Sequence, residues 1–246
     1  TGEVLYRLNS DAQLPLASLT KAALVLAVRD AMPSDSIITI PYDTAPKGAA
    51  MRLAKGEKWK LGDVINFTLI SSSNEGADIL AQAADAAIRA RYPQAPHGDA
   101  ALWRMNNLAQ SLGLTHTYFL NVSGLDLSGT QSGAYGSAED FAELFAYAAS
   151  TTPESFSGTT RDGLLLTDED GNTTSAFNTN EALGAIPGLI MGKTGYTDLA
   201  GGNLAVVFDV GLAHPVVAVV LGSTHDGRFA DMKRLVTAAR AAVAQQ

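Results

Sequence analysis

The 246-residue chain contains no cysteine. Disulfide bonds, thiolate metal sites and a cysteine nucleophile are therefore excluded. Only four histidines are present, and no two of them are spaced as His-x-x-x-His, so the sequence does not indicate a metal site. Long apolar runs are absent too: none approaches the roughly 20 residues that a transmembrane helix needs. We therefore predict a chain without metal or cofactor that does not itself span a membrane.

Basic residues are also scarce. Lys and Arg number 17 against 25 Asp and Glu, which gives a formal net charge of −8. This balance excludes the basic surface that nucleic acid requires, and no polybasic segment is present to hold an anionic membrane. The sequence begins at Thr1 without Met or a signal peptide. We therefore expect a mature or trimmed domain, with any leader or membrane anchor outside these residues.

The apolar pattern predicts helices in the middle of the chain and strands toward both ends. Helices are predicted over residues 18–31, 61–71, 74–89, 99–112, 137–149 and 230–243. Strands are predicted over residues 2–8, 37–40, 164–166, 204–210 and 215–221. The polar stretch 151–180 is interpreted as a surface excursion with one short strand. We expect a single α/β domain of the α+β type over residues 1–246. A mainly antiparallel sheet from both termini would be flanked by helices, with an all-helical lobe at roughly 45–150 and a cleft where they meet.

Three short motifs follow one another along the chain: Ser18-Leu19-Thr20-Lys21, Ser72-Ser73-Asn74 and Lys193-Thr194-Gly195. In this order they form the S-x-x-K, S-x-N and K-T-G set of penicillin-binding proteins and class A β-lactamases. Each motif alone is a weak signal. The predicted helices place the first motif at the start of a helix and the second between two helices, where side chains can point into a cleft.

The residue types of these motifs suit acyl transfer to a serine. A hydroxyl is a poor nucleophile at neutral pH and needs a base, and Lys21 is one helical turn from Ser18. Burial and a second cation, for which Lys193 is the candidate, would lower the Lys21 pKa. Ser72 is expected to pass a proton to the leaving amine, and Asn74 to bind the Lys21 amine and the substrate amide.

The third motif is interpreted as a substrate-binding strand. Lys193 and Thr194 are expected to hold a substrate carboxylate, and Gly195 to let a substrate backbone lie close to the strand. A helix N-terminus at Ser18 would favour a developing oxyanion.

Each of these residues also has an ordinary structural explanation. Ser18 suits a helix N-cap, Ser72 and Asn74 suit helix ends, and Lys193 suits a solvated turn. The shared order and context of the three motifs favour a site over three separate coincidences. Four further polar residues, taken singly, are interpreted as packing or surface residues: Arg161, Arg228, His116 and His225.

Together these features make the chain resemble the low-molecular-mass penicillin-binding proteins, the serine-type D-alanyl-D-alanine carboxypeptidases. Beyond the three motifs, the likeness includes five stretches that extend it over nearly all of residues 1–243: GEVL at 2–5, LISSSNEGA at 69–77, FLNVSGLD at 119–126, NTN at 178–180 and MGKTGYTDLAGGN at 191–203. Arg228-Phe229 before the last helix also fits this family.

The resemblance implies a β-lactamase/transpeptidase-like fold and a role for each matching residue. Ser18 would be the acylated nucleophile and Lys21 its base, with Ser72, Asn74 and Lys193 completing the catalytic set. The backbone N–H groups of Ser18 and Tyr196 would form the oxyanion hole. Substrate binding would fall to Lys193, Thr194, Gly195 and Arg228. The implied partners are peptidoglycan stem peptides and β-lactams, in an extracytoplasmic location such as the periplasm, and no cofactor is implied.

Some positions depart from the family pattern and leave alternatives open. Ser73 stands where Gly is common, and Thr179 stands where some members have Arg, which bears on carboxylate recognition. The chain ends before the carboxy-terminal β domain and membrane-binding helix of longer members, so a trimmed carboxypeptidase and a shorter endopeptidase are both compatible. A class A β-lactamase would need a Glu-x-x-x-Asn loop, which we do not find between the second and third motifs. A non-catalytic penicillin-binding sensor is a further alternative.

Overall fold

The computed structural model describes residues 2–211 and 213–244. Its helices are α1 (Thr20–Ala31), α2 (Leu61–Ile70), α3 (Asn74–Arg91), α4 (Ala100–Ser111), α5 (Ala138–Thr151) and α6 (Gly227–Val243), with 3₁₀ segments η1 (Ala17–Leu19), η2 (Pro153–Thr160) and η3 (Leu183–Ala185). In the described part of the chain, none of these helices combines the length and apolar character that crossing a membrane requires.

The strands pair in antiparallel fashion throughout. The main sheet has the order β10-β9-β8, from β8 (Leu189–Thr197), β9 (Gly201–Asp209) and β10 (Pro215–Ser223). A smaller sheet has the order β1-β5-β4, from β1 (Leu14–Pro15), β4 (Tyr118–Phe119) and β5 (Ala134–Gly136). Two separate pairs complete the set: β2 (Ile37–Thr39) with β3 (Lys58–Lys60), and β6 (Gly163–Thr167) with β7 (Thr173–Phe177).

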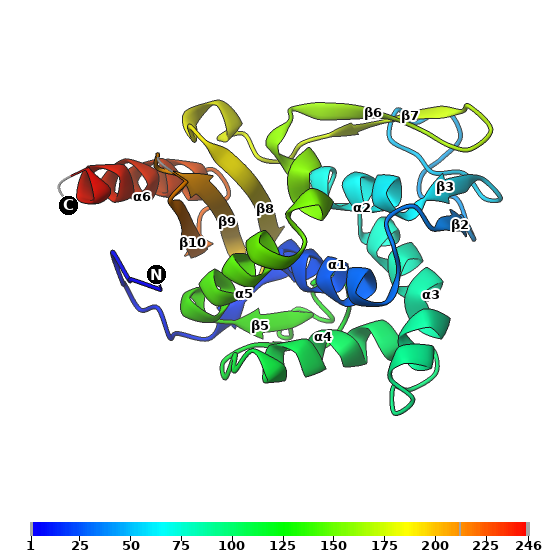
Figure 1. Ribbon diagram of the computed structural model, residues 1–246, viewed down its shortest axis with the longest axis horizontal. Coiled ribbons are helices and arrows are strands. Elements are labelled where there is room, and N and C mark those ends of the chain that lie inside the picture. The colour runs from blue at the N-terminus through cyan, green and yellow to red at the C-terminus, as the bar shows by residue number, and fades with distance from the viewer. Residues whose placement is uncertain (1, 212, 245–246) are drawn as a thin grey trace.

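Both faces of the main sheet are covered, which explains the nearly continuous apolar sequence of β9. Because side chains alternate along a strand, Ala205 and Val207 face the large core, while Leu204 and Val206 face α6. In Figure 1, α6 lies along one side of this sheet, and α5 and α1 lie on the other. This packing makes β8 a fixed wall beside the start of α1.

Helix α1 is the centre of the molecule. Its residues from Thr20 to Val28 are all buried, as expected for a helix that is apolar on every side. It contacts α2, α3 and α4 on the helical side and leads back through η1 to the main sheet (Figure 1). The residues just before α1 therefore lie at the boundary between sheet and helices.

The predicted α+β class is confirmed, and the predicted helices and the predicted hairpin of β9 and β10 are present. The strand predicted over residues 2–8 was wrong. That segment alternates apolar and polar residues like a strand, but it pairs with no strand among the described residues, and Val4, Tyr6 and Leu8 are exposed. The main sheet is consequently built from residues 189–223 and not from both termini.

The stretch 151–180 also differs from the prediction of a surface excursion with one strand. It contains the two-stranded hairpin β6–β7, and η2 within it buries Phe156 completely. The single apolar run at 164–166 revealed β6. Its partner β7, with the sequence TTSAF, has too little apolar character to be recognised alone.

Candidate active site

The first motif folds into a tight turn followed by a helix. Ser18 lies in η1, and Lys21 lies in the first turn of α1. The Lys21 Nζ donates to the Ser18 Oγ at 2.7 Å. The cap position of α1 is Leu19, without a side-chain cap, so Ser18 is not the N-cap that its sequence context allowed. Its hydroxyl is directed toward the lysine amine.

The Lys21 amine is held from three sides and is fully buried. Besides Ser18, it donates to the Asn74 Oδ1 at 2.8 Å and to the Ser123 carbonyl at 2.8 Å. A carbonyl and an amide oxygen only accept hydrogen bonds. When the amine is neutral, its two hydrogens therefore go to these two acceptors, and its lone pair is left facing the Ser18 hydroxyl.

Burial makes that neutral state accessible. It lowers the pKa of Lys21 from 10.5 to about 7, against the opposing pull of the Asp78 and Glu75 carboxylates. The sequence had suggested that burial and Lys193, as a second cation, together lower this pKa. Burial is the largest cause in the structure. A substantial fraction of the amine is therefore neutral near pH 7, as a general base requires.

The second and third motifs meet at another buried amine. The Lys193 Nζ donates to the Ser72 Oγ at 2.8 Å and to the Thr194 carbonyl at 2.8 Å, and it is 1% exposed. Burial, followed by the charges of Lys21 and Arg228, holds its pKa well below the usual value. Lys193 is thus not a solvated turn residue. It is also not among the residues that line the cavity, where we had expected it to hold a substrate carboxylate.

Ser72 occupies a strained position between α2 and α3. Its φ of 59° lies in the left-handed region, which costs a non-glycine residue about 1–3 kcal/mol. The N-cap of α3 is Ser73, whose side chain accepts from the Gly76 N–H. With capping assigned to Ser73, the hydroxyl of Ser72 is free to bind Lys193 and to line the cavity.

Gly195 lines the cavity, where we expect it to admit a substrate backbone, and it also packs closely against the turn before α1. A Cβ placed there would lie 2.9 Å from the Leu16 carbonyl and 3.3 Å from the Ala17 Cβ. The missing side chain therefore lets β8 rest on the turn that carries Ser18. The same approach brings Tyr196, the next residue of β8, to the cavity beside Ser18.

Arg228, at the start of α6, is 4% exposed. Its Nη1 donates to the Gly195 carbonyl at 2.7 Å, and its guanidinium lies over the Phe229 ring, 4.6 Å from the centroid. Its buried Nε has no hydrogen-bond partner among the described residues. Burial lowers the pKa of this guanidinium, while the carboxylates of Glu181 and Asp226 raise it. A largely buried cation that lines a cavity is suited to an anion.

These residues surround one cavity of about 270 Å³. The walls come from η1, the α2–α3 junction, β8, and the connections before α6 and after β4. The lining residues are Ser18, Ser72, Asn74, Leu125, Thr179, Thr194, Gly195, Tyr196, Thr197, His225 and Arg228. The structure thus brings together every residue that the three motifs placed in the site, with Lys21 and Lys193 directly beneath the cavity floor.

Sequence reasoning about individual residues missed the loop that closes the site. Ser123 supplies an acceptor for Lys21, and Asp126 accepts from the Thr197 Oγ1 at 3.0 Å. Gly124, with φ of 79°, lies so close to Ala17 that no side chain fits. The sequence signal for this loop was the stretch FLNVSGLD at 119–126. It supported the family resemblance, but no role was assigned to its residues.

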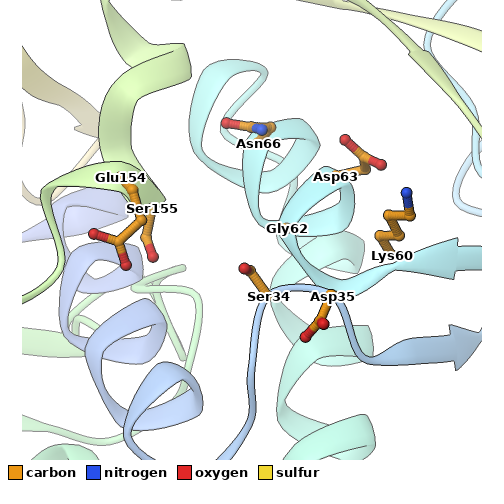
Figure 2. Close-up of a pocket in the computed structure, with 8 residues that line it drawn as sticks. All are labelled: Ser34, Asp35, Lys60, Gly62, Asp63, Asn66, Glu154 and Ser155. Carbon is orange, nitrogen blue, oxygen red and sulfur yellow. The ribbon is translucent and has the colours of Figure 1, made fainter.

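A second cavity, of about 300 Å³, lies away from this site between the start of α2, the turn before β2, and η2 (Figure 2). Asp35, Asp63 and Glu154 line it together with Lys60. None of the motif residues belongs to it. Within the described residues, no group of three or more His, Asp or Glu side chains is placed to hold a metal ion.

Comparison with known sequences gives consistent matches. A family model described as D-alanyl-D-alanine carboxypeptidase matches residues 1–225. The D-alanyl-D-alanine carboxypeptidase DacF of Bacillus subtilis is 29% identical over 245 residues, covering 96% of this chain and 58% of DacF. A D-alanyl-D-alanine endopeptidase of Pseudomonas aeruginosa is 30% identical, with 96% of this chain and 72% of the relative covered. The chain therefore spans somewhat more than half the length of DacF.

Solved structures with the same fold include penicillin-binding protein D2 from Listeria monocytogenes in its ampicillin-bound form. It matches with a TM-score of 0.77 and 29% identity, covering 96% of this chain and 91% of the other. A point mutant of the Streptomyces K15 DD-transpeptidase matches with a TM-score of 0.79 at 22% identity, covering 98% of this chain and 94% of the other. At that identity the second likeness concerns the fold alone.

Proposed function

The chain belongs to the D-alanyl-D-alanine carboxypeptidase family, and we propose that it is a serine D,D-peptidase that acts on peptidoglycan stem peptides through an acyl-enzyme on Ser18. One observation carries this proposal: the buried Lys21 amine lies 2.7 Å from the Ser18 hydroxyl, with its pKa lowered to about 7. A hydroxyl beside a partly neutral amine is the pair that nucleophilic catalysis by serine needs.

In the acylation step, the Ser18 Oγ attacks the carbonyl carbon of the penultimate D-alanine, and its proton passes to the Lys21 Nζ. The backbone N–H groups of Ser18 and Tyr196 stabilise the resulting oxyanion. The C–N bond then breaks, and the proton on Lys21 passes through the Ser72 hydroxyl to the leaving D-alanine amine, which leaves Lys21 neutral for deacylation. Lys193 orients that hydroxyl from below through its 2.8 Å hydrogen bond.

Deacylation uses the same groups, with water as the nucleophile and Ser18 as the leaving group. A water molecule gives a proton to Lys21 and attacks the ester carbonyl, and the Ser18 Oγ leaves with that proton. Asn74 holds the amine in place during both steps through its Oδ1. A protein that works by these two steps is also acylated by penicillins, because the β-lactam ring presents a comparable amide carbonyl to Ser18.

The free carboxylate of the terminal D-alanine binds beside the third motif. Thr194 lines the cavity with its hydroxyl hydrogen-bonded to Thr179, and Arg228 lines the same cavity. We assign carboxylate recognition to Thr194 and Arg228. Lys193, which is enclosed beneath Ser72, orients the Ser72 hydroxyl and does not contact the carboxylate directly.

Peptidoglycan lies outside the cytoplasmic membrane, so the proposed activity places the protein in an extracytoplasmic compartment, where it would serve cell-wall maturation and cell shape. Endopeptidase cleavage of cross-links is the second candidate, favoured by the 30% identity with the Pseudomonas aeruginosa endopeptidase. Both reactions use the same acyl-enzyme and differ in whether the leaving amine is free D-alanine or a cross-linked peptide.

The test combines adduct mapping with product analysis. Incubation with a labelled penicillin is expected to give one adduct, on Ser18, that is absent from Ser18→Ala. A stem pentapeptide and a cross-linked dimer then separate the two candidates, according to whether D-alanine or monomeric stem peptides are released. An adduct on another residue would contradict the assignment of Ser18, and release of neither product would contradict the peptidase.

A further inference from the structure

His225, treated as a surface or packing residue on sequence grounds, lines the cavity of the proposed active site. It lies in the connection between β10 and α6, three residues before Arg228. Its ring packs edge-on against Tyr196 of β8, with centroids 4.8 Å apart and planes at 82°. The side chain is half exposed, with 51% of its surface accessible. It is therefore open to protons from solvent while touching two residues of the site.

The hydrogen bonds of His225 define one tautomer. The Nδ1 lies 2.6 Å from the Asp226 Oδ1, and a carboxylate only accepts, so Nδ1 carries a proton. In the neutral ring, Nε2 therefore has a lone pair. That lone pair faces the Arg228 Nη2 at 3.4 Å. Asp226, His225 and Arg228 thus form a chain of carboxylate, imidazole and guanidinium that ends at the proposed carboxylate site.

We propose that His225 is a positioning residue that orients the Arg228 guanidinium toward the substrate carboxylate only while its imidazole is neutral. The inference rests on the proposed function, in which Arg228 recognises the terminal carboxylate. The opposite edge of the guanidinium is fixed by the Gly195 carbonyl. With acceptors on both edges, the Arg228 guanidinium has one orientation at the cavity.

Protonation of His225 would convert its Nε2 from an acceptor into an N–H donor. This N–H would face the Arg228 guanidinium, which can only donate hydrogen bonds. The titratable and charged groups around the imidazole are Asp226 from its own connection, Arg228 from α6 and Tyr196 from β8, and Glu181 acts on Arg228. Asp226 is 88% exposed, so its compensating charge is largely screened. The contact would then join two donors that both carry positive charge, and we expect this to displace Arg228 from its orientation.

The first test does not depend on activity. The Arg228 Nε–H resonance is assigned by its absence from Arg228→Lys and followed by ¹⁵N NMR across pH 5–8, the range in which histidines titrate. It is expected to titrate together with the His225 ring resonances. In His225→Phe, which keeps a ring against Tyr196 but has no acceptor, the Arg228 resonance should stay constant. An Arg228 resonance that does not follow His225 in the unmodified protein overturns the inference, even if Ser18 is acylated as proposed.

The second test separates binding from chemistry. The KM for a stem pentapeptide is expected to rise about tenfold or more from pH 8 to pH 5, as expected for loss of a hydrogen bond to a charged group. His225→Phe should have the raised KM at every pH. His225→Gln, which offers a neutral amide oxygen, should restore much of the loss and remove its pH dependence. Protonation of Lys21 affects kcat in all these chains alike and so cancels in the comparison.

Two controls complete the design. In the first, the same peptide with a C-terminal amide should show no change in KM that depends on His225. In the second, the His97→Gln variant, changed at an exposed position outside the cavity, should have the same KM as the unmodified chain. A KM that falls at low pH, or equal effects of His225→Phe on the acid and the amide, would overturn the inference. Absence of peptidase activity from the unmodified chain would count against the proposed function, and the NMR titration would then decide the inference alone.

Discussion

Gly195 packs so closely against Leu16 that a Cβ on Gly195 would lie 2.9 Å from the Leu16 carbonyl oxygen. This contact joins β8 to the turn that positions Ser18. The alignment of the Ser18 hydroxyl with Tyr196 depends on it, because both residues take their positions from the two segments that meet there.

The Gly195→Ala variant should therefore lose activity more than stability. The added methyl group forces β8 away from η1, an overpacking that costs about 1–3 kcal/mol. We expect the Tm to fall by a few degrees and the rate of Ser18 acylation by penicillin to fall at least tenfold. Gly184→Ala, at an open position in η3, is the matched control, and equal acylation rates in both variants would refute the positional argument.

Removal of the proposed base should slow chemistry without preventing folding. General acid–base groups contribute about 10²–10⁴-fold, so Lys21→Ala should reduce the acylation rate by at least that range. Ser18→Ala should give no adduct at all, and the double variant should be no worse than Ser18→Ala. Circular dichroism confirms folding, and near-normal acylation of Lys21→Ala would show that another group acts as base.

The rate of acylation should depend on pH in a defined direction. Since the neutral amine is the reactive form, the rate with a β-lactam should rise with pH and level off above about 7, the pKa of Lys21. Stopped-flow measurements between pH 5 and 9 would show this profile. A rate that declines over this range would contradict the role of Lys21 as base.

The same shift predicts how stability changes with pH. The Lys21 pKa is about 7 when folded and about 10.5 when unfolded, so between these values the unfolded chain binds more protons. The contribution of Lys21 to the free energy of unfolding should therefore increase as pH rises from 7 toward 10. Urea titrations of the unmodified chain and of Lys21→Met, compared at pH 7 and pH 9.5, isolate this contribution. A constant difference would mean that Lys21 is not buried as a partly neutral amine.

The position of Lys193 changes the expectation for its removal. A lysine on the cavity wall would discriminate substrates with a carboxylate, but this amine is enclosed between Ser72 and the Thr194 carbonyl. Lys193→Met should therefore lower kcat to a similar extent for a pentapeptide acid and its C-terminal amide, with little change in their relative KM. A selective loss for the acid would restore Lys193 as the direct carboxylate ligand.

The sequence was most informative where local patterns decide structure. Apolar periodicity located α1 through α6, and the motifs placed Ser18 beside the start of α1, Ser72 between α2 and α3, and Lys193 on a strand. It failed where partners are distant. Residues 2–8 alternate like a strand, but alternation cannot reveal whether a partner strand exists. The depth of Lys193 was likewise hidden, because burial of a lysine depends on Ser72, 121 residues away.

The acceptors of the Lys21 amine come from η1, from the start of α3 and from the glycine-rich loop around Ser123, which are separated from Lys21 by up to 102 residues. No local segment can assemble that arrangement alone. Before the last of these segments docks, Lys21 is an ordinary hydrated ammonium and Ser18 an unreactive alcohol. The Ser18 hydroxyl thus becomes nucleophilic only when the tertiary structure is complete. A newly synthesised or partly unfolded chain would therefore not be acylated at Ser18.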